Sequence, residues 1–173
     1  DSFWDDEEYN VRHSIWGRFK AGDDPGTYRF KKLGWEETFF DYREPNNHVL
    51  HSLLARSTLT MWQAVSPPKG LPFTEWPLRV PAWLFGILGV ATIAWFLKDA
   101  GFAGAGVVAA FLMALHPWVL RYASEMRGYS MVVALVPVAL VAWRRAHCGG
   151  TWRWWLAYAG VQWAILYTYP GVL

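Results

Sequence analysis

One charged stretch of the chain combines residue types that could do chemistry. The hexapeptide Ser124 to Tyr129 stands between two apolar runs, 101–120 and 129–143, that carry no formal charge. It is therefore expected to be the turn of a membrane hairpin. Glu125 and Arg127 at a membrane boundary suit a polar ligand. A solvated turn in which these two side chains pair only with each other explains the same residues, and the segment alone leaves both interpretations open.

Four adjacent carboxylates near the beginning of the chain form a second candidate: Asp5, Asp6, Glu7 and Glu8. One of them could act as a general base, and a pair could hold a divalent cation through oxygen ligands. An acidic first turn of a helix, stabilised by the positive end of the helix dipole, is the simpler alternative.

A third group contains His48 and His51, three residues apart, which share a predicted helix face with Arg56. Imidazole and guanidinium groups together suit a phosphate or another anion. Zinc is not favoured, because no third ligand follows at a familiar spacing. The alternative is a polar helix face directed at water. The single cysteine, Cys148, excludes an internal disulfide.

The composition divides the 173-residue chain in two. Twelve of the fourteen acidic residues lie at or before Glu75, and apolar runs dominate the rest of the chain. The chain begins without Met and ends inside an apolar run, so it is interpreted as a fragment of a longer protein. A formal net charge of +2 with dispersed basic residues does not favour a nucleic-acid partner.

The expected fold class is all-α, a multi-span helical membrane protein. An extracytoplasmic loop over 1–78 is expected to contain an amphipathic helix over 1–19, a turn over 21–26 and an interfacial helix over 48–62 capped by Asn47. Residues 27–44 show no clear pattern. Residues 79–173 should hold about four transmembrane helices, over about 80–97, 102–120, 128–143 and 154–173.

The number of crossings makes a prediction that no motif supplies. Two crossings separate the acidic segment from Glu125 and Arg127, so both polar groups should face one compartment. The basic residues of the intervening loops should face the other, cytoplasmic side.

Four short motifs in order resemble those of the GT-C membrane glycosyltransferases, best the protein O-mannosyltransferase and aminoarabinose transferase superfamily. Asp6-Glu7 is similar to the family's Asp-Glu motif, and 78–86 to its Arg-Leu-Pro-Ser-Ala-Leu-Phe-Gly stretch. His116-Pro117 with 122–129 is similar to its Tyr-Ser-Glu-Ala-Arg-Tyr turn, and 167–169 to its Tyr-Thr-His-Tyr. The chain departs from the family at 44–49, where many members carry His-Pro-Pro-Leu-Tyr-Tyr.

This resemblance implies transfer of a sugar from a polyprenyl-phosphate donor to a glycan, lipid or protein acceptor, with inversion, at the extracytoplasmic face of a bacterial plasma membrane. It implies that Asp6 is the base and that Glu7 supports it or joins it in holding a divalent metal, which the sequence itself does not require. Contacts with substrate and phosphate are expected from the remaining candidates: His48, Glu125, Arg127 and Tyr129. A non-catalytic membrane protein, such as a transporter fragment or an assembly subunit, is the alternative.

Overall fold

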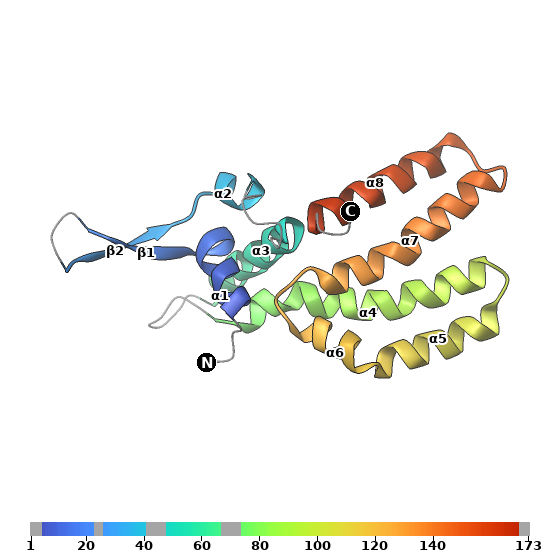
Figure 1. Cartoon of the computed structure of the whole chain (residues 1–173), viewed down its shortest axis with the longest axis horizontal. Helices are drawn as coiled ribbons and strands as arrows, with labels where there is room; N and C mark the ends of the chain where they lie inside the picture. Colours follow the sequence, from blue (N-terminus) through green and yellow to red (C-terminus); the bar gives the residue numbers. More distant parts are fainter. Residues whose placement is uncertain (1–4, 23–25, 41–47, 67–73, 170–173) are drawn as a thin grey trace.

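The computed structural model describes residues 5–22, 26–40, 48–66 and 74–169 (Figure 1). They form a mostly helical protein, as predicted, with one antiparallel two-stranded sheet that the all-α prediction missed. In chain order the elements are α1 (Asp5–Asn10), η1 (Val11–Ile15, a π-helical turn), β1 (Gly17–Ala21), β2 (Tyr28–Lys32), α2 (Trp35–Phe40), α3 (Val49–Val65), α4 (Trp76–Asp99), α5 (Ala103–Leu115), α6 (Pro117–Ser124), α7 (Tyr129–His147) and α8 (Trp152–Thr168).

The sheet corrects the prediction of one amphipathic helix over 1–19. Helical structure ends at Ile15, Gly17 adopts a φ of 147°, and the chain then enters β1. This backbone conformation is rarely open to residues with a side chain. Phe19, placed by the prediction on the buried helix face, is instead 70% exposed on the strand.

Residues 27–44, for which the sequence made no prediction, contain β2 and α2. The turn predicted over 21–26 falls between the two strands, but its residues 23–25 lie outside the described residues. On either side of them the Gly22 amide donates to the Thr27 carbonyl at 2.8 Å. At the start of α2 the Glu37 carboxylate accepts a hydrogen bond of 2.7 Å from the Gly34 amide. This satisfies a backbone donor that the helix cannot pair internally.

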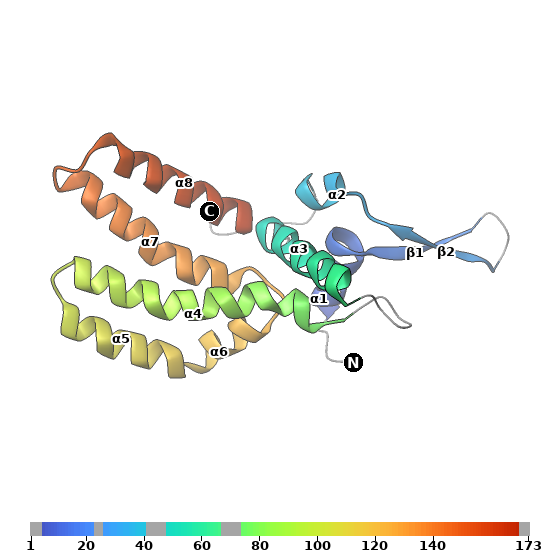
Figure 2. The same cartoon turned by 180° about the vertical axis from the view of Figure 1, so that it is seen from behind.

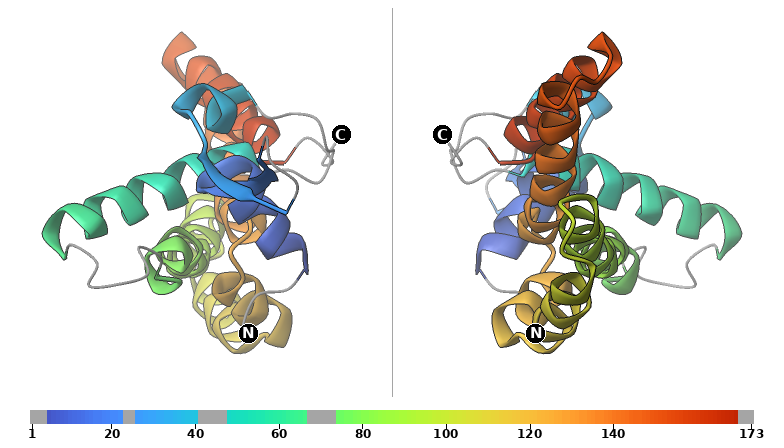
Figure 3. Two further views of the ribbon diagram at one scale, coloured as in Figure 1. Left: turned by 90° about the vertical axis from the view of Figure 1, so that its left-hand side faces the viewer. Right: turned by 90° about the vertical axis from the view of Figure 1, so that its right-hand side faces the viewer.

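Helix α4 is the centre of the bundle. It packs against α3, α5, α6 and α7, and α8 packs on α7. Figure 3 shows α3 running across the end of the bundle rather than along it. Pro81 inside α4 cannot donate to the Pro77 carbonyl. The Thr58 hydroxyl of α3 donates to that carbonyl instead, at 2.6 Å, which fixes the crossing of the two helices.

Among the described residues, α4 and α7 are each long and apolar enough to cross a membrane. A third candidate is the pair α5 and α6, bent by 61° at their junction. The helix predicted over 102–120 is not continuous, because His116 precedes a proline and adopts an extended conformation, which breaks it. The bent pair is still a candidate for the predicted second crossing. The bend makes α6 a separate short helix that ends beside the charged turn.

The fourth predicted crossing, 154–173, is not among these candidate spans. Helix α8 ends at Thr168, and Tyr169 before Pro170 is extended. Its 17 residues measure about 25 Å, less than the roughly 30 Å of a bilayer's hydrocarbon core. The helix predicted over 48–62 is present as α3. The predicted Asn47 cap and the departure from the family motif at 44–47 lie outside the described residues.

A small apolar core joins the N-terminal segment to the bundle. Its members come from η1, α3, the start of α4 and the charged turn: Val11, Ile15, Ala55, Leu59, Leu78 and Met126, with Trp16 against them. Met126, in the middle of the charged hexapeptide, is fully buried there. The acidic segment and the turn are therefore held together by packing as well as by charge.

Candidate functional site

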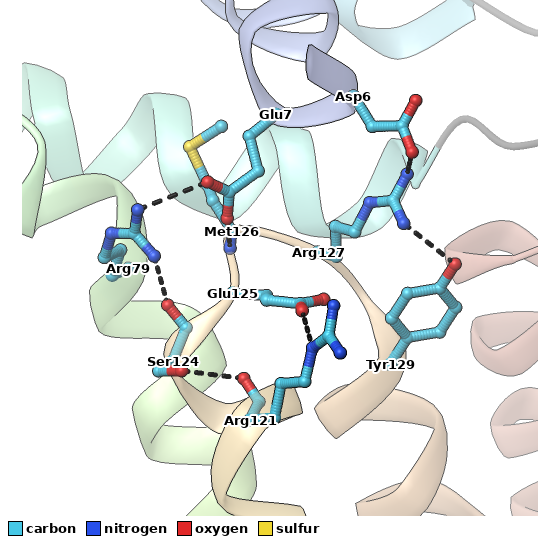
Figure 4. Close-up of polar contacts among 9 residues, drawn as sticks. All are labelled: Asp6, Glu7, Arg79, Arg121, Ser124, Glu125, Met126, Arg127 and Tyr129. Atoms are coloured by element: carbon cyan, nitrogen blue, oxygen red, sulfur yellow. Dashed lines mark hydrogen bonds and ion pairs between the residues drawn. The ribbon is translucent and has the colours of Figure 1, made fainter. Parts of the chain in front are cut away.

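The two clusters that the sequence predicted to face one compartment are in direct contact. The Asp6 carboxylate pairs with the Arg127 guanidinium at 2.5 Å, although 121 residues separate them in the chain (Figure 4). Arg127 also donates to the Tyr129 hydroxyl at 3.3 Å and lies over that ring. Asp6 keeps 62% of its side chain exposed, so a group from solution can reach it beside Arg127.

Glu7 lies in a different environment from its neighbour. Its side chain is 1% exposed; one carboxylate oxygen accepts from the Met126 amide at 2.5 Å, and the other pairs with Arg79 at 3.2 Å. Arg79 also donates to the Ser124 carbonyl. Through Arg79 and Met126, Glu7 ties α1 to the start of α4 and to both sides of the turn.

The remaining charges of the turn complete a small pocket. Glu125 pairs with Arg121 of α6 at 2.6 Å, one helical turn away, rather than with Arg127. The self-paired turn considered from sequence is therefore not what the structure contains. A pocket of about 100 Å³ lies among these charged side chains, which are Asp6, Glu7, Arg121, Glu125 and Arg127.

His48 lies behind Tyr129 and does not line this pocket. Its ring is buried, 4.8 Å from the ring centre of Tyr129 and 5.0 Å from that of Tyr169. Gly128 packs closely against it, because a Cβ on Gly128 would lie 3.0 Å from His48 Nδ1. His48 can therefore position Tyr129, but in this arrangement His48 does not reach a ligand in the pocket.

The predicted grouping of His48, His51 and Arg56 as an anion site does not form. Arg56 turns toward α2 and donates to the carbonyls of Leu33 and Gly34 at 2.7 and 2.6 Å. His51 is fully buried and its ring nitrogens have no hydrogen-bond partner within the part of the chain described. Arg56 thus fixes the loop before α2 and is not available to an anion beside the histidines.

Burial keeps both histidines neutral. It lowers the pKa of His51 to about 3, with the neighbouring His48 adding to the effect. Burial followed by the Arg127 charge lowers the pKa of His48 to about 4, against a smaller opposing influence of the Thr168 backbone and Asp6. A neutral His48 cannot supply positive charge to a phosphate at neutral pH.

These shifts predict a loss of stability in mild acid. As the pH falls from about 6.5 toward 4, the unfolded chain binds protons on both histidines that the folded chain does not bind, so folding weakens. The thermal unfolding midpoint in detergent should drop over this range, and His51→Gln should reduce the drop. His13→Gln, at a partly exposed position, is the matched control. Equal pH dependence in parent and His51→Gln would contradict the account.

The carboxylates do not fit the divalent metal that the resemblance allows. Both oxygens of Glu7 are engaged by Met126 and Arg79, and Asp6 faces Arg127, so a cationic group already lies beside each. Within the described ranges no group of three or more His, Cys, Asp and Glu side chains converges. In the pocket each carboxylate is thus engaged by an arginine, which leaves no pair of carboxylates directed at a cation.

Comparison with known proteins adds no relative. No family model, curated protein or solved structure matched this chain. Functional inference therefore depends on the geometry of the pocket.

Two residues of this geometry were missed as site residues. Arg79 was noted only within the stretch 78–86 that resembles a family motif, and Arg121 only as a charge beside a span, yet one holds Glu7 and the other holds Glu125. The predicted topology could have identified them. It places Arg79 and Arg121 on the same side of the membrane as the acidic segment, where each can pair with a carboxylate.

Proposed function

We propose that this protein is a glycosyltransferase of the GT-C type, acting at the extracytoplasmic face of a bacterial plasma membrane. It would move a sugar from a polyprenyl-phosphate donor to a hydroxyl group of a glycan, lipid or protein acceptor. The observation that carries the proposal is the Asp6–Arg127 ion pair, which joins an accessible carboxylate to a cation at one end of apolar helices. A lipid-linked anion requires a site at such a boundary.

In the proposed reaction the acceptor oxygen attacks the anomeric carbon while the bond from that carbon to the phosphate oxygen breaks. The electron pair of the broken bond leaves with the polyprenyl phosphate, and the hydroxyl proton passes to Asp6. A single displacement inverts the anomeric centre. A positioned carboxylate base typically contributes about 10²- to 10⁴-fold to such a step.

The arginines would stabilise the leaving phosphate. Arg127 is 17% exposed and held against Tyr129, so its guanidinium is already oriented. Arg121 lines the same pocket from α6. Preorganised cations directed at developing negative charge lower the barrier more than mobile ones, because they need no reorganisation during the reaction. In this proposal a donor phosphate takes the place that Asp6 occupies on Arg127.

Glu7 and Glu125 receive different roles. Glu7 is a positioning residue, since it is buried and both its oxygens are engaged. Glu125 lines the pocket and is proposed to accept hydrogen bonds from sugar hydroxyls. His48 and Tyr129 support Arg127 from the side of α7.

Donor turnover tests the proposal. The full chain in nanodiscs is incubated with undecaprenyl-phosphate mannose, glucose or aminoarabinose and a membrane extract as acceptor source. The expected result is release of undecaprenyl phosphate from one donor, coupled to labelled sugar in an acceptor fraction. Failure with every donor would favour the non-catalytic membrane protein instead.

A further inference from the structure

The β1–β2 hairpin has two chemically distinct faces. Its register places Arg18 opposite Lys31 and Lys20 opposite Arg29, so four cations share one face. The other face carries Phe19 opposite Phe30, with ring centres 5.3 Å apart, and a single cation, Lys32, which lies over the Trp16 ring. Figures 1 and 2 show the hairpin extending away from the helical bundle.

The cationic face is unfavourable for the hairpin alone. Like charges directly opposite each other destabilise an antiparallel pair. Lysines on edge strands discourage aggregation, but this role does not explain why four cations are gathered on one face. Glu37 of α2 lies against this face, 3.3 Å from Lys31. The hydrogen bond from the Gly34 amide lowers the pKa of Glu37, and Lys31 and Lys20 add to this effect. The face is thus directed toward α2.

A pocket of about 310 Å³ lies at the base of this face. Arg18 belongs to both. The opposite wall is formed by Glu36, Glu37 and the ring of Phe40, which is 77% exposed. Carboxylates that accept from hydroxyl groups, beside an open aromatic ring, are the groups that recognise a sugar ring.

Helix α1 and the turn η1 each add a ring to the lining of this pocket, and α1 connects it with the candidate site. Tyr9 and His13 stack with ring centres 4.1 Å apart and line the pocket. Asp6 precedes Tyr9 by three residues on the same helix, and residues at this spacing share a helix face. A ligand in the pocket would therefore lie along α1 toward Asp6.

We propose that the hairpin and this pocket bind an anionic saccharide, with its acidic groups on the four cations and a sugar ring in the pocket. Glu36 and Glu37 would repel any acidic group at the pocket, so a saccharide should present its ring hydroxyl groups to these carboxylates and its acidic groups to the cations. Nucleic acid offers no comparable set of ring hydroxyl groups. The surface of the bilayer is disfavoured as the partner of these cations, because the hairpin projects away from the bundle that would cross the bilayer. The claim that this saccharide is the acceptor rests on the proposed function. The claim that the hairpin and pocket bind it does not.

The test measures binding without any donor. The full chain is placed in phosphatidylcholine nanodiscs at low salt, and fluorescein-labelled hexagalacturonate is titrated by anisotropy. Lys20→Ser with Arg29→Ser should weaken binding about tenfold or more, since two charge-assisted contacts are lost. This double change removes a like-charge pair, so the hairpin should stay folded. Lys98→Ser with Arg153→Ser removes two exposed cations at the opposite end of the bundle and should change binding less than about twofold.

Two results would overturn the inference. Equal affinity of the parent and of the Lys20, Arg29 double variant would remove the cationic face as the binding surface. Binding of a single-stranded oligonucleotide of equal charge as tightly as the hexagalacturonate would show attraction by charge alone. Phe40→Ala should weaken hexagalacturonate binding and leave oligonucleotide binding unchanged, which separates the pocket from the charges. If the parent chain binds hexagalacturonate but turns over no donor, the proposed transferase function is refuted and the saccharide site still stands.

Discussion

Asp6→Asn is expected to abolish sugar transfer, lowering the rate by about 10²- to 10⁴-fold, the usual contribution of a general base. The amide has nearly the size of the carboxylate but cannot take the acceptor proton. Packing should be little affected, because the Asp6 side chain is largely exposed and α1 is held by Glu7 and by the core around Val11 and Met126. Donor turnover in nanodiscs measures the change.

Asp5→Asn is the matched control for this experiment. Asp5 is an exposed neighbouring carboxylate that does not line the pocket. Its variant should keep turnover within about twofold of the parent, since an exposed surface charge contributes little. Parent-like turnover by Asp6→Asn would remove Asp6 as the base. Equal losses in both variants would show that only the negative charge of the acidic segment matters, and not Asp6 in particular.

Glu7→Ala should have the largest effect on stability. Removing one partner of a buried ion pair leaves the other uncompensated and typically costs about 3–5 kcal/mol. Here the change removes the Glu7 carboxylate from Arg79, and it also leaves the buried Met126 amide without its acceptor. Helix α1 should separate from the turn. Hydrogen exchange of the Met126 amide, together with proteolysis of the N-terminal segment, reports this opening.

Glu8→Ala provides the comparison, because Glu8 is about half exposed and pairs with Arg12, four residues further along the chain. It should cost well under 1 kcal/mol. Glu7→Gln should lie between the two, since its amide oxygen can still accept from Met126. Unchanged exchange at Met126 in Glu7→Ala would show that the charge network does not hold the segment in place.

The meeting of the two clusters could be predicted from sequence because it depends on counting crossings. The apolar run that became α4, and the run broken into α5 and α6, return the chain to the side from which it started. Asp6 and Arg127 are then available to each other whatever the details of packing. The turn itself could be placed because charges interrupt two long apolar stretches.

The partners within the site could not be predicted in the same way. Glu125 lies four residues from Arg121 and two from Arg127, so the sequence offers both partners. The structure pairs it with Arg121 across the end of α6 and leaves Arg127 for Asp6. The fate of Arg56 likewise depended on α2, an element with no clear periodicity. The hairpin was missed although both strands alternate aromatic or small residues with basic ones. Each strand is only five residues long and mostly exposed, so the alternation is short and marks no buried face.

Thiol labelling in intact cells tests most directly whether the acidic segment and the turn form one extracytoplasmic site. Single cysteines replace Asp5 or Ser124, both exposed, in a Cys148→Ser background, and a membrane-impermeant maleimide is added from outside. The account predicts labelling at both positions, while native Cys148, exposed beyond the end of α7, reacts only after permeabilisation. Labelling at only one of the two positions would place Asp6 and Arg127 on opposite sides of the membrane and contradict the shared site.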